Sequence, residues 1–189
     1  MRISRRVLLG AALAGPLLTR RQSERRGGVR LVDLEEGCAL PESLSGFQRY
    51  LAGAPASNSN LIVIPGAGAI DPDHAGMIVR FLDHRTTVLL ECQSATALGI
   101  ENDRAPALDR YHPYVEYTWP AQLKLREFMP AWFRAARSDS VIATFAGRPV
   151  GLRRRLGKGT LIVLGSALGP MFLAGDQDAG RWLEALQAG

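Results

Sequence analysis

Residues 61–99, LIVIPGAGAIDPDHAGMIVRFLDHRTTVLLECQSATALG, contain the clearest structural pattern in the chain. Leu61–Ile64 and Thr87–Leu90 are short apolar runs, typical of strands that are buried on both faces. Between them, apolar residues recur at the spacing of one helix face, and Asp71 followed by Pro72 indicates where that helix begins. The stretch therefore predicts a strand, a helix and a second strand, an alternation typical of parallel sheets.

Two chemical features of this stretch lie where the predicted strands end. Pro65-Gly66-Ala67-Gly68 predicts a glycine turn after the first strand, where backbone N–H groups stand free of side chains. Cys92 follows the second strand, and Gln93–Leu98 is predicted to begin another helix. Ligands of open α/β sheets bind outside the carboxyl ends of the strands. We therefore expect Gly66 and Cys92 to share one crevice, which is the candidate site.

The positive charge of the protein is concentrated at its N-terminus. The 189 residues carry a formal net charge of +5, but residues 1–30 contain eight arginines and one acidic residue, Glu24, a net of +7. The remainder is therefore mildly acidic, at −2. A basic leader on an acidic domain gives no argument for nucleic acid binding.

This leader has the features of an export signal. Ser4-Arg5-Arg6-Val7-Leu8-Leu9 resembles the twin-arginine signal of bacteria, and Val7–Leu18 is an apolar segment too short to span a bilayer. We expect residues 1–28 to form an export signal and basic linker, and residues 29–189 to form a single periplasmic or otherwise extracytoplasmic domain. Contact with a membrane is expected only through the signal. The alternative is a basic N-terminal segment of a cytoplasmic protein.

The remaining segments complete the predicted sheet. The pattern predicts a first strand at Val29–Leu34, a helix at Glu42–Leu51, and a final helix capped by Asp176. Three further strands are predicted at Val141–Phe145, Val150–Leu156 and Thr160–Leu164. The tight glycine turns between these three strands favour antiparallel hairpins attached to the main sheet. The run Arg153-Arg154-Arg155 is interpreted as a solvated sheet edge.

The segment from Gly99 to Trp119 is long, irregular and aromatic. In it, His112 and Glu116 alternate with apolar residues and are expected on one face. Loops of this length are usually functional or disordered, and the aromatic content argues against disorder. We interpret the segment as a flap over the crevice; the alternative is that its aromatic residues pack against the edge of the sheet.

With these elements in place, the chain resembles the class I glutamine amidotransferase-like superfamily. The resemblance covers Leu61 to Leu186 and depends on the PGAG turn, the LECQSATALG elbow around Cys92, and the last strand leading into a C-terminal helix. It implies a flavodoxin-like three-layer α/β sandwich with a mostly parallel sheet and C-terminal antiparallel hairpins. It also implies a nucleophilic role for Cys92 and an oxyanion-binding role for the turn.

The sequence departs from the superfamily at its catalytic positions. Leu90 and Ser94 replace the glycines that flank the nucleophile, and no histidine or glutamate follows the final strand. A thiol near its ordinary pKa of about 8.5 is only a few per cent thiolate at neutral pH, so it needs a base. His112, oriented by Glu116, is the best available base, since His84 is remote and His74 need not point inward. A second route to an active thiol uses a nearby carboxylate, for which Glu35, Glu36 or Glu91 is available. As an anion, such a carboxylate would raise the thiol pKa, unless it is protonated and donates a hydrogen bond.

Two functions remain open. In the first, the domain has no amidotransferase activity and binds an unknown small molecule or protein near Gly66 and Cys92. In the second, it is a thiol hydrolase or amidase with Cys92 as nucleophile, His112 as base, and the amides of Gly66, Ala67 and Gln93 as oxyanion donors. If Cys92 is not a nucleophile, we expect it to be a buried core residue or to form a disulfide with Cys38. The scattered histidines and cysteines show no metal-ligand spacing, and no cofactor is expected.

Overall fold

The structure, a computed structural model, describes residues 23–26, 28–34, 39–54, 59–104 and 113–189. Its helices are α1 (Pro41–Gly53), α2 (Pro72–Leu82), α3 (Gly169–Leu173) and α4 (Gln177–Ala188), with a 3₁₀ turn η1 at Thr96–Leu98. Its first strands are β1 (Ser23–Arg26), β2 (Val29–Val32), β3 (Leu61–Ala69), β4 (Thr87–Ser94) and β5 (Glu101–Asn102). The later strands are β6 (Tyr114–Tyr117), β7 (Leu123–Arg126), β8 (Phe133–Arg134), β9 (Asp139–Phe145), β10 (Arg148–Leu156) and β11 (Gly159–Leu164).

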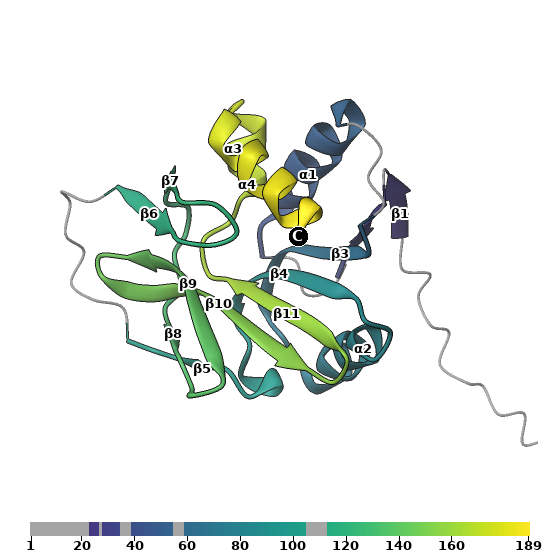
Figure 1. The fold of residues 1–189 in the computed structure, drawn as a ribbon, viewed down its shortest axis with the longest axis vertical. Coiled ribbons are helices and arrows are strands. Elements are labelled where there is room, and N and C mark those ends of the chain that lie inside the picture. The colour runs from purple at the N-terminus through teal and green to yellow at the C-terminus, as the bar shows by residue number, and fades with distance from the viewer. Residues whose placement is uncertain (1–22, 27, 35–38, 55–58, 105–112) are drawn as a thin grey trace, which may run out of the picture.

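Nine of these strands form one sheet in the order β1-β2-β3-β4-β11-β10-β9-β6-β7, and β5 pairs with β8 beside it (Figure 1). Within the described residues, the three pairings from β2 to β11 are parallel and the other five pairings of the large sheet are antiparallel. β1 lies in the segment predicted as a basic linker, and it pairs with β2.

The predicted flavodoxin-like three-layer sandwich with a mostly parallel sheet is wrong. The protein is built on a strand-rich mixed sheet with few helices, and most of its strand pairings are antiparallel. The reason lies in residues 113–164, where strands follow one another with no intervening helix. Strands joined by tight turns pair antiparallel, because a parallel pairing needs a long crossover.

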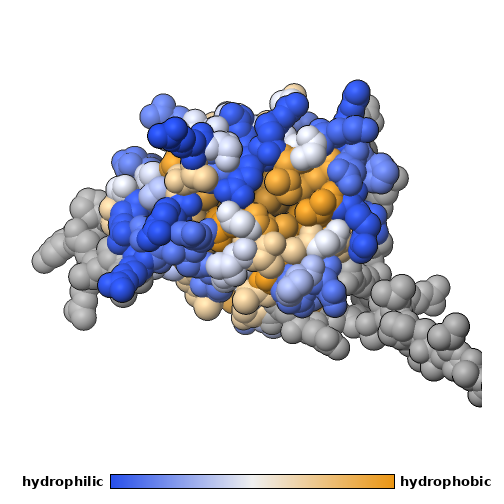
Figure 2. All heavy atoms as spheres, turned by 90° about the horizontal axis from the view of Figure 1, so that it is seen from below, coloured by the Kyte–Doolittle hydropathy of each residue, from blue (hydrophilic) through white to orange (hydrophobic). Residues whose placement is uncertain are grey.

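Two hydrophobic clusters lie against the sheet. The first joins α1, α3 and α4 to strand residues such as Val63 and Leu89. The second joins α2 to residues one step along the same strands, such as Ile64 and Leu90. This alternation follows from the two-residue period of a strand, because the parallel strands are buried on both faces. Viewed from below, the molecule shows an apolar area at the centre of the face, bordered by hydrophilic residues (Figure 2).

Several predicted elements are confirmed. α2 begins after Asp71, whose side chain accepts a hydrogen bond from the His74 N–H, and α4 begins after Asp176, which caps its first turn. The three C-terminal strands appear as β9, β10 and β11.

The predicted helix after Cys92 is wrong in its position, because β4 continues to Ser94 and only the short turn η1 follows.

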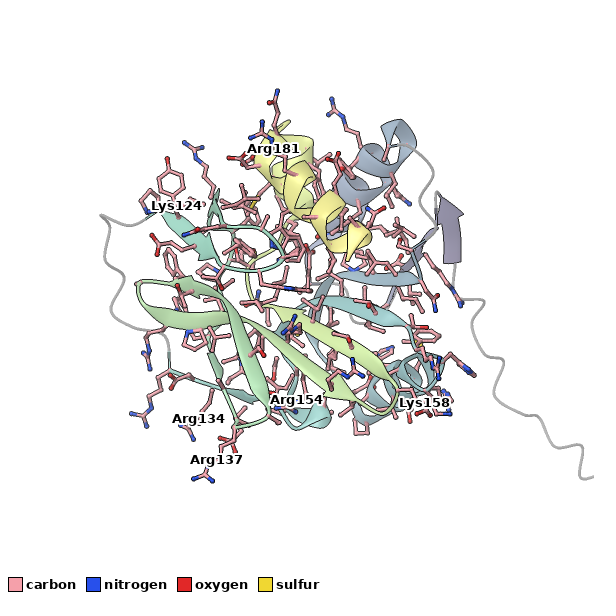
Figure 3. All side chains as sticks on the ribbon, viewed as in Figure 1. Lys124, Arg134, Arg137, Arg154, Lys158 and Arg181 are labelled. Atoms are coloured by element: carbon pink, nitrogen blue, oxygen red, sulfur yellow. The ribbon has the colours of Figure 1, made fainter. Side chains whose placement is uncertain are left out.

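The predicted solvated edge at Arg153–Arg155 is also wrong. β10 lies inside the sheet between β11 and β9, so its arginines point to the two faces. Arg154 Nε donates to Asp139 Oδ1 at 2.5 Å and Arg154 Nη1 to the carbonyls of Leu98 and Gly99 at 3.2 Å, beside η1 (Figure 3). The Asp139 side chain is fully buried. Arg154 therefore ties β10 to β9 and to the end of η1.

Candidate functional site

The carboxyl ends of β3, β4 and β11 meet at the predicted crevice. β3 does not stop at the glycine turn: it is interrupted between Ile64 and Ala67 and then pairs with β4 again. At this interruption Gly66 has a φ of +61°, and a Cβ there would lie 2.4 Å from the Leu40 carbonyl oxygen. The Gly66 carbonyl accepts hydrogen bonds from the N–H groups of Ala39 and Leu40. Glycine is needed here because the chain preceding α1 packs directly on the turn.

Glu91, next to Cys92 on β4, is the most constrained polar group at this edge. Its carboxylate is 1% exposed and accepts hydrogen bonds from the Ser43 hydroxyl, the Gly66 N–H at 3.2 Å and the Leu168 N–H at 2.6 Å. The Gly169 N–H is a further partner. Burial raises the pKa of Glu91 to about 7, although these four hydrogen bonds favour the charged form. Glu91 therefore connects β4 to α1, to the turn in β3 and to the start of α3.

Cys92 points to the opposite face of β4. It belongs to the cluster under α2, is 3% exposed and carries a free thiol. Burial, and then the negative charge of Glu91, raise the pKa of the thiol far above its ordinary value. At neutral pH the thiol is therefore protonated, which is the direction expected for a thiol beside a carboxylate. Cys38, its predicted disulfide partner, lies outside the described residues.

The crevice itself is almost filled. The cavity beside Gly66, Cys92 and Gln93 has a volume of about 10 Å³, roughly the space of one water molecule. Residues 127–131 lie across it: the Gln93 side chain donates to the Met129 carbonyl at 2.9 Å, and the Ala131 N–H donates to the Gly165 carbonyl at 2.9 Å. The Phe128 N–H also donates to the Ser166 hydroxyl. This segment, and not the predicted flap, closes the crevice in the described residues.

The structure brings together some of the predicted site residues and separates others. Gly66, Ala67, Cys92 and Gln93 line the same small cavity. The Gly66 N–H donates to Glu91, so it is not a free oxyanion donor. Glu116 lies on β6, which pairs with β9 and β7, and its exposed carboxylate pairs with Lys124 at 2.7 Å.

The histidines do not supply a described base at the crevice. His112 lies outside the described residues, so its predicted role stays a prediction. His74 pairs with the Asp71 carboxylate at 2.9 Å, and His84 lies just beyond the C-terminal end of α2. Tyr117, from the segment interpreted as a flap, is buried in the first cluster against the Trp182 ring. Strand β6 of that segment thus extends the large sheet, and Tyr117 packs there as in the alternative interpretation.

The sequence did not predict the roles of Glu91 or of residues 127–131. Glu91 was considered only as a neighbour of the thiol, whereas the structure makes its carboxylate the acceptor for donors from three segments. A single carboxylate within the apolar run LLEC was the available signal, because a charge buried in such a run needs several partners. No pattern in residues 127–131 indicated that they cover the crevice.

No protein-family model matches the chain, and no curated protein matches it. Solved structures that resemble it include the N-terminal domain of mmIFT52, with a TM-score of 0.56 and 13% identity over 82% of this chain and 94% of that one. Another is the exo-β-1,4-mannosidase Op5Man5 from Opitutaceae bacterium strain TAV5, with a TM-score of 0.51 and 20% identity over 67% of this chain. The match spans only 25% of the mannosidase chain. At these identities the likeness concerns the fold alone.

Proposed function

We propose that this chain is an exported binding domain without amidotransferase activity, and that its ligand or partner docks at the edge near Gly66 and Cys92. The proposal includes the resemblance to glutamine amidotransferase-like proteins, which rests on the PGAG turn and on Cys92. The observation that carries it is the state of Cys92: the thiol is buried, its pKa is raised, and the adjoining cavity holds about one water. A nucleophile needs a thiolate and room for a substrate, and neither is provided.

The surface over the closed crevice supports a binding role. Phe128 and Met129 are 36% and 49% exposed, at a place where the backbone is held by the hydrogen bonds to Ser166 and Gly165 described above. Met129 has a φ of +48°, which is unusual for a residue with a side chain. Strained backbone that persists in a well-tied segment is often found at functional positions. The apolar pair is therefore the proposed contact surface for a partner.

The reactivity of Cys92 tests the non-catalytic part of the proposal. The full chain is treated with iodoacetamide from pH 5 to pH 9, and modification at Cys92 is read by mass spectrometry, with Cys92→Ser as the blank. We expect Cys92 to be modified only after unfolding in urea. Prompt modification below pH 7 that is slowed in His112→Ala would instead establish the thiol hydrolase with Cys92 as nucleophile and His112 as base.

Cross-linking tests the proposed contact surface. A photo-reactive amino acid is placed at Met129 and, as a matched control, at Val79, which is 40% exposed on α2. In cells that produce the protein, we expect a discrete cross-linked product from position 129 and none from position 79. Equal products from both positions would argue against docking at this edge.

Export depends on residues 1–28, of which residues 1–22 and 27 lie outside the described part of the chain. None of the helices in the described residues is long and apolar enough to cross a bilayer. We expect the protein to reach the periplasm of a bacterium with the twin-arginine route, and the double variant Arg5→Lys, Arg6→Lys to remain in the cytoplasm. Cell fractionation measures the location of the wild type and of the double variant. If the two proteins were distributed alike, the result would contradict a twin-arginine signal.

A further inference from the structure

A cavity of about 400 Å³ lies at the opposite edge of the parallel strands from Cys92. Its lining comes from the beginning of β2, the beginning of β3, the residues just before β4 and the end of α2. This volume is within the range of about 300–1,000 Å³ that is typical of small-molecule sites. The cavity is large enough for a ligand, in contrast to the space beside Cys92.

One side of this cavity is apolar. Ile62, on β3, is a member of the second cluster, and Phe81, near the end of α2, packs against that cluster while remaining partly exposed. Leu61 completes the apolar lining. A flat aromatic ring next to aliphatic side chains is suited to a ligand with an apolar, planar body.

The cationic side of the cavity is Arg30. Its guanidinium carbon lies 5.3 Å from the centre of the Phe81 ring, and the residue is exposed. Among the described residues no carboxylate forms an ion pair with Arg30, and the described residues that line the cavity include no Asp or Glu. The N–H fork of an arginine matches the geometry of a carboxylate or phosphate group. The cavity therefore carries one positive charge with no described acidic partner.

Neighbouring polar groups are arranged around this charge. His84 lines the cavity, and the Asn60 amide donates to the Thr86 hydroxyl at 3.0 Å, which orients both of these side chains in the lining. The cavity lies near the negative end of the α2 dipole, but the Asp83 and His84 N–H groups donate to the Val79 and Phe81 carbonyls there. These bonds satisfy part of the helix end, so Arg30 is the dominant charge at the cavity.

We propose that this cavity binds a small organic acid, with a carboxylate or phosphate monoester paired to Arg30 and a flat apolar body against Phe81 and Ile62. The site is separate from the crevice at Cys92, and the proposal does not depend on the function proposed there. Its specificity comes from two requirements, since the ligand needs both the negative group and the apolar body.

Titration of the full chain with phenyl phosphate and benzoate tests the proposal. Calorimetry gives the affinity, and the His84 ring signals in proton NMR report whether the cavity is occupied. We expect saturable binding that shifts the His84 signals, and at least a tenfold weaker affinity in Arg30→Gln. Arg80→Gln is the matched control, because Arg80 is exposed on α2 and does not line the cavity; its affinity should equal that of the wild type.

Four results would overturn the proposal. The first is no saturable binding of either acid, and the second is an unchanged affinity in a folded Arg30→Gln variant, checked by circular dichroism. The third is equal binding of benzyl alcohol, which would show that the charge is not recognised. The fourth is inorganic phosphate binding as tightly as phenyl phosphate, which would show that the apolar lining is not used.

Discussion

The two edges of the parallel strands differ in how their space and charges are used. At the carboxyl edge, the cavity beside Cys92 measures about 10 Å³, and the buried Glu91 carboxylate has a hydrogen-bond donor from each of three segments. At the amino edge, the cavity beside Arg30 measures about 400 Å³, and that cation lies over the Phe81 ring without an ion pair to a described carboxylate. The carboxyl edge is packed for stability, and the amino edge keeps a cation that no described carboxylate pairs with.

This difference matters because open α/β sheets usually bind ligands at the carboxyl edge. Here the carboxyl edge is closed by residues 127–131 and by the chain that precedes α1. A site is identified by the geometry and charge of its own residues, and fold analogy alone does not locate it. The comparison predicts that substitutions of the buried Glu91 and Gly66 at the carboxyl edge reduce stability, whereas substitution of Arg30 at the amino edge changes the binding of a small ligand there.

The largest effect is expected for Glu91→Ala. The substitution leaves the Ser43 hydroxyl and the Gly66 and Leu168 N–H groups buried without their acceptor, which should lower the free energy of unfolding by about 4 kcal/mol. Urea unfolding measures this loss of free energy. Glu101→Ala is the control: this carboxylate is 68% exposed and pairs with an exposed Arg134, so we expect a loss of about 0.5 kcal/mol or less. Equal losses would remove the distinction between a packed edge and an ordinary surface.

The pH dependence of stability should also depend on Glu91. Its pKa is about 7 in the folded protein and 4.5 in the unfolded chain, so between these values the folded state binds more protons. The contribution of Glu91 is therefore fully present below pH 4.5 and is lost as the pH rises towards 7, a change of about 3 kcal/mol.

Urea unfolding at pH 5 and pH 8 measures this change, with Glu91→Gln as the non-titrating control. We expect the wild type to lose more stability between these pH values than the variant does. If the wild type instead gained stability between pH 5 and pH 8 relative to Glu91→Gln, the four hydrogen bonds would outweigh burial and hold the pKa of Glu91 low.

A smaller loss is expected for Gly66→Ala. The new Cβ would lie 2.4 Å from the Leu40 carbonyl oxygen at a φ of +61°, so we expect about 3 kcal/mol of destabilisation in thermal or urea unfolding. Gly76→Ala is the matched control in α2, where a Cβ has no heavy atom within 4 Å. It should stabilise the protein by about 1 kcal/mol, because alanine is the better helix former. A harmless Gly66→Ala would show that the carboxyl edge is loosely packed.

The smallest effect on stability is expected at the amino edge. Within the described residues, Arg30→Gln removes a cation–π contact of an exposed side chain with Phe81, so the free energy of unfolding should change by about 0.5 kcal/mol or less. The same urea titrations measure it. A loss above about 2 kcal/mol would show that Arg30 is a structural residue, and the two edges would then not differ in the way proposed.

Local sequence patterns predicted the elements better than their arrangement. Apolar runs and capping residues located β3, α2, β4 and α4, because these signals act within a few residues. The tight turns also predicted the two antiparallel hairpins of β9, β10 and β11, which the structure confirms. Sheet order depends on contacts far apart in the chain, so the parallel pairing of β11 with β4 and the place of β6 and β7 beyond β9 were not predicted. The ion pair of Arg154 with the buried Asp139 carboxylate was missed, because the arginine run was interpreted as a solvated edge although the hairpins make β10 the middle strand.

The candidate site was predicted only in part. Gly66 and Cys92 come together because both lie near the carboxyl ends of the parallel strands β3 and β4, and the residues that line the cavity beside Cys92 include Gly66 and Ala67. The closure of that cavity depends on residues 127–131, which are remote in sequence and carry no motif. The amino-edge cavity was not predicted, since Arg30, Phe81 and His84 come from separate elements with no common pattern.

The last strand of the described sheet order has a consequence for solubility. β7 ends the sheet opposite β1, and an edge strand presents backbone groups to which another chain could add a strand. On β7, Lys124 and Arg126 are exposed on either side of the buried Leu125, and Lys124 lies at the periphery of the molecule (Figure 3). Two such strands placed edge to edge would bring like charges together. The cations of β7 therefore disfavour the pairing of two copies through this edge.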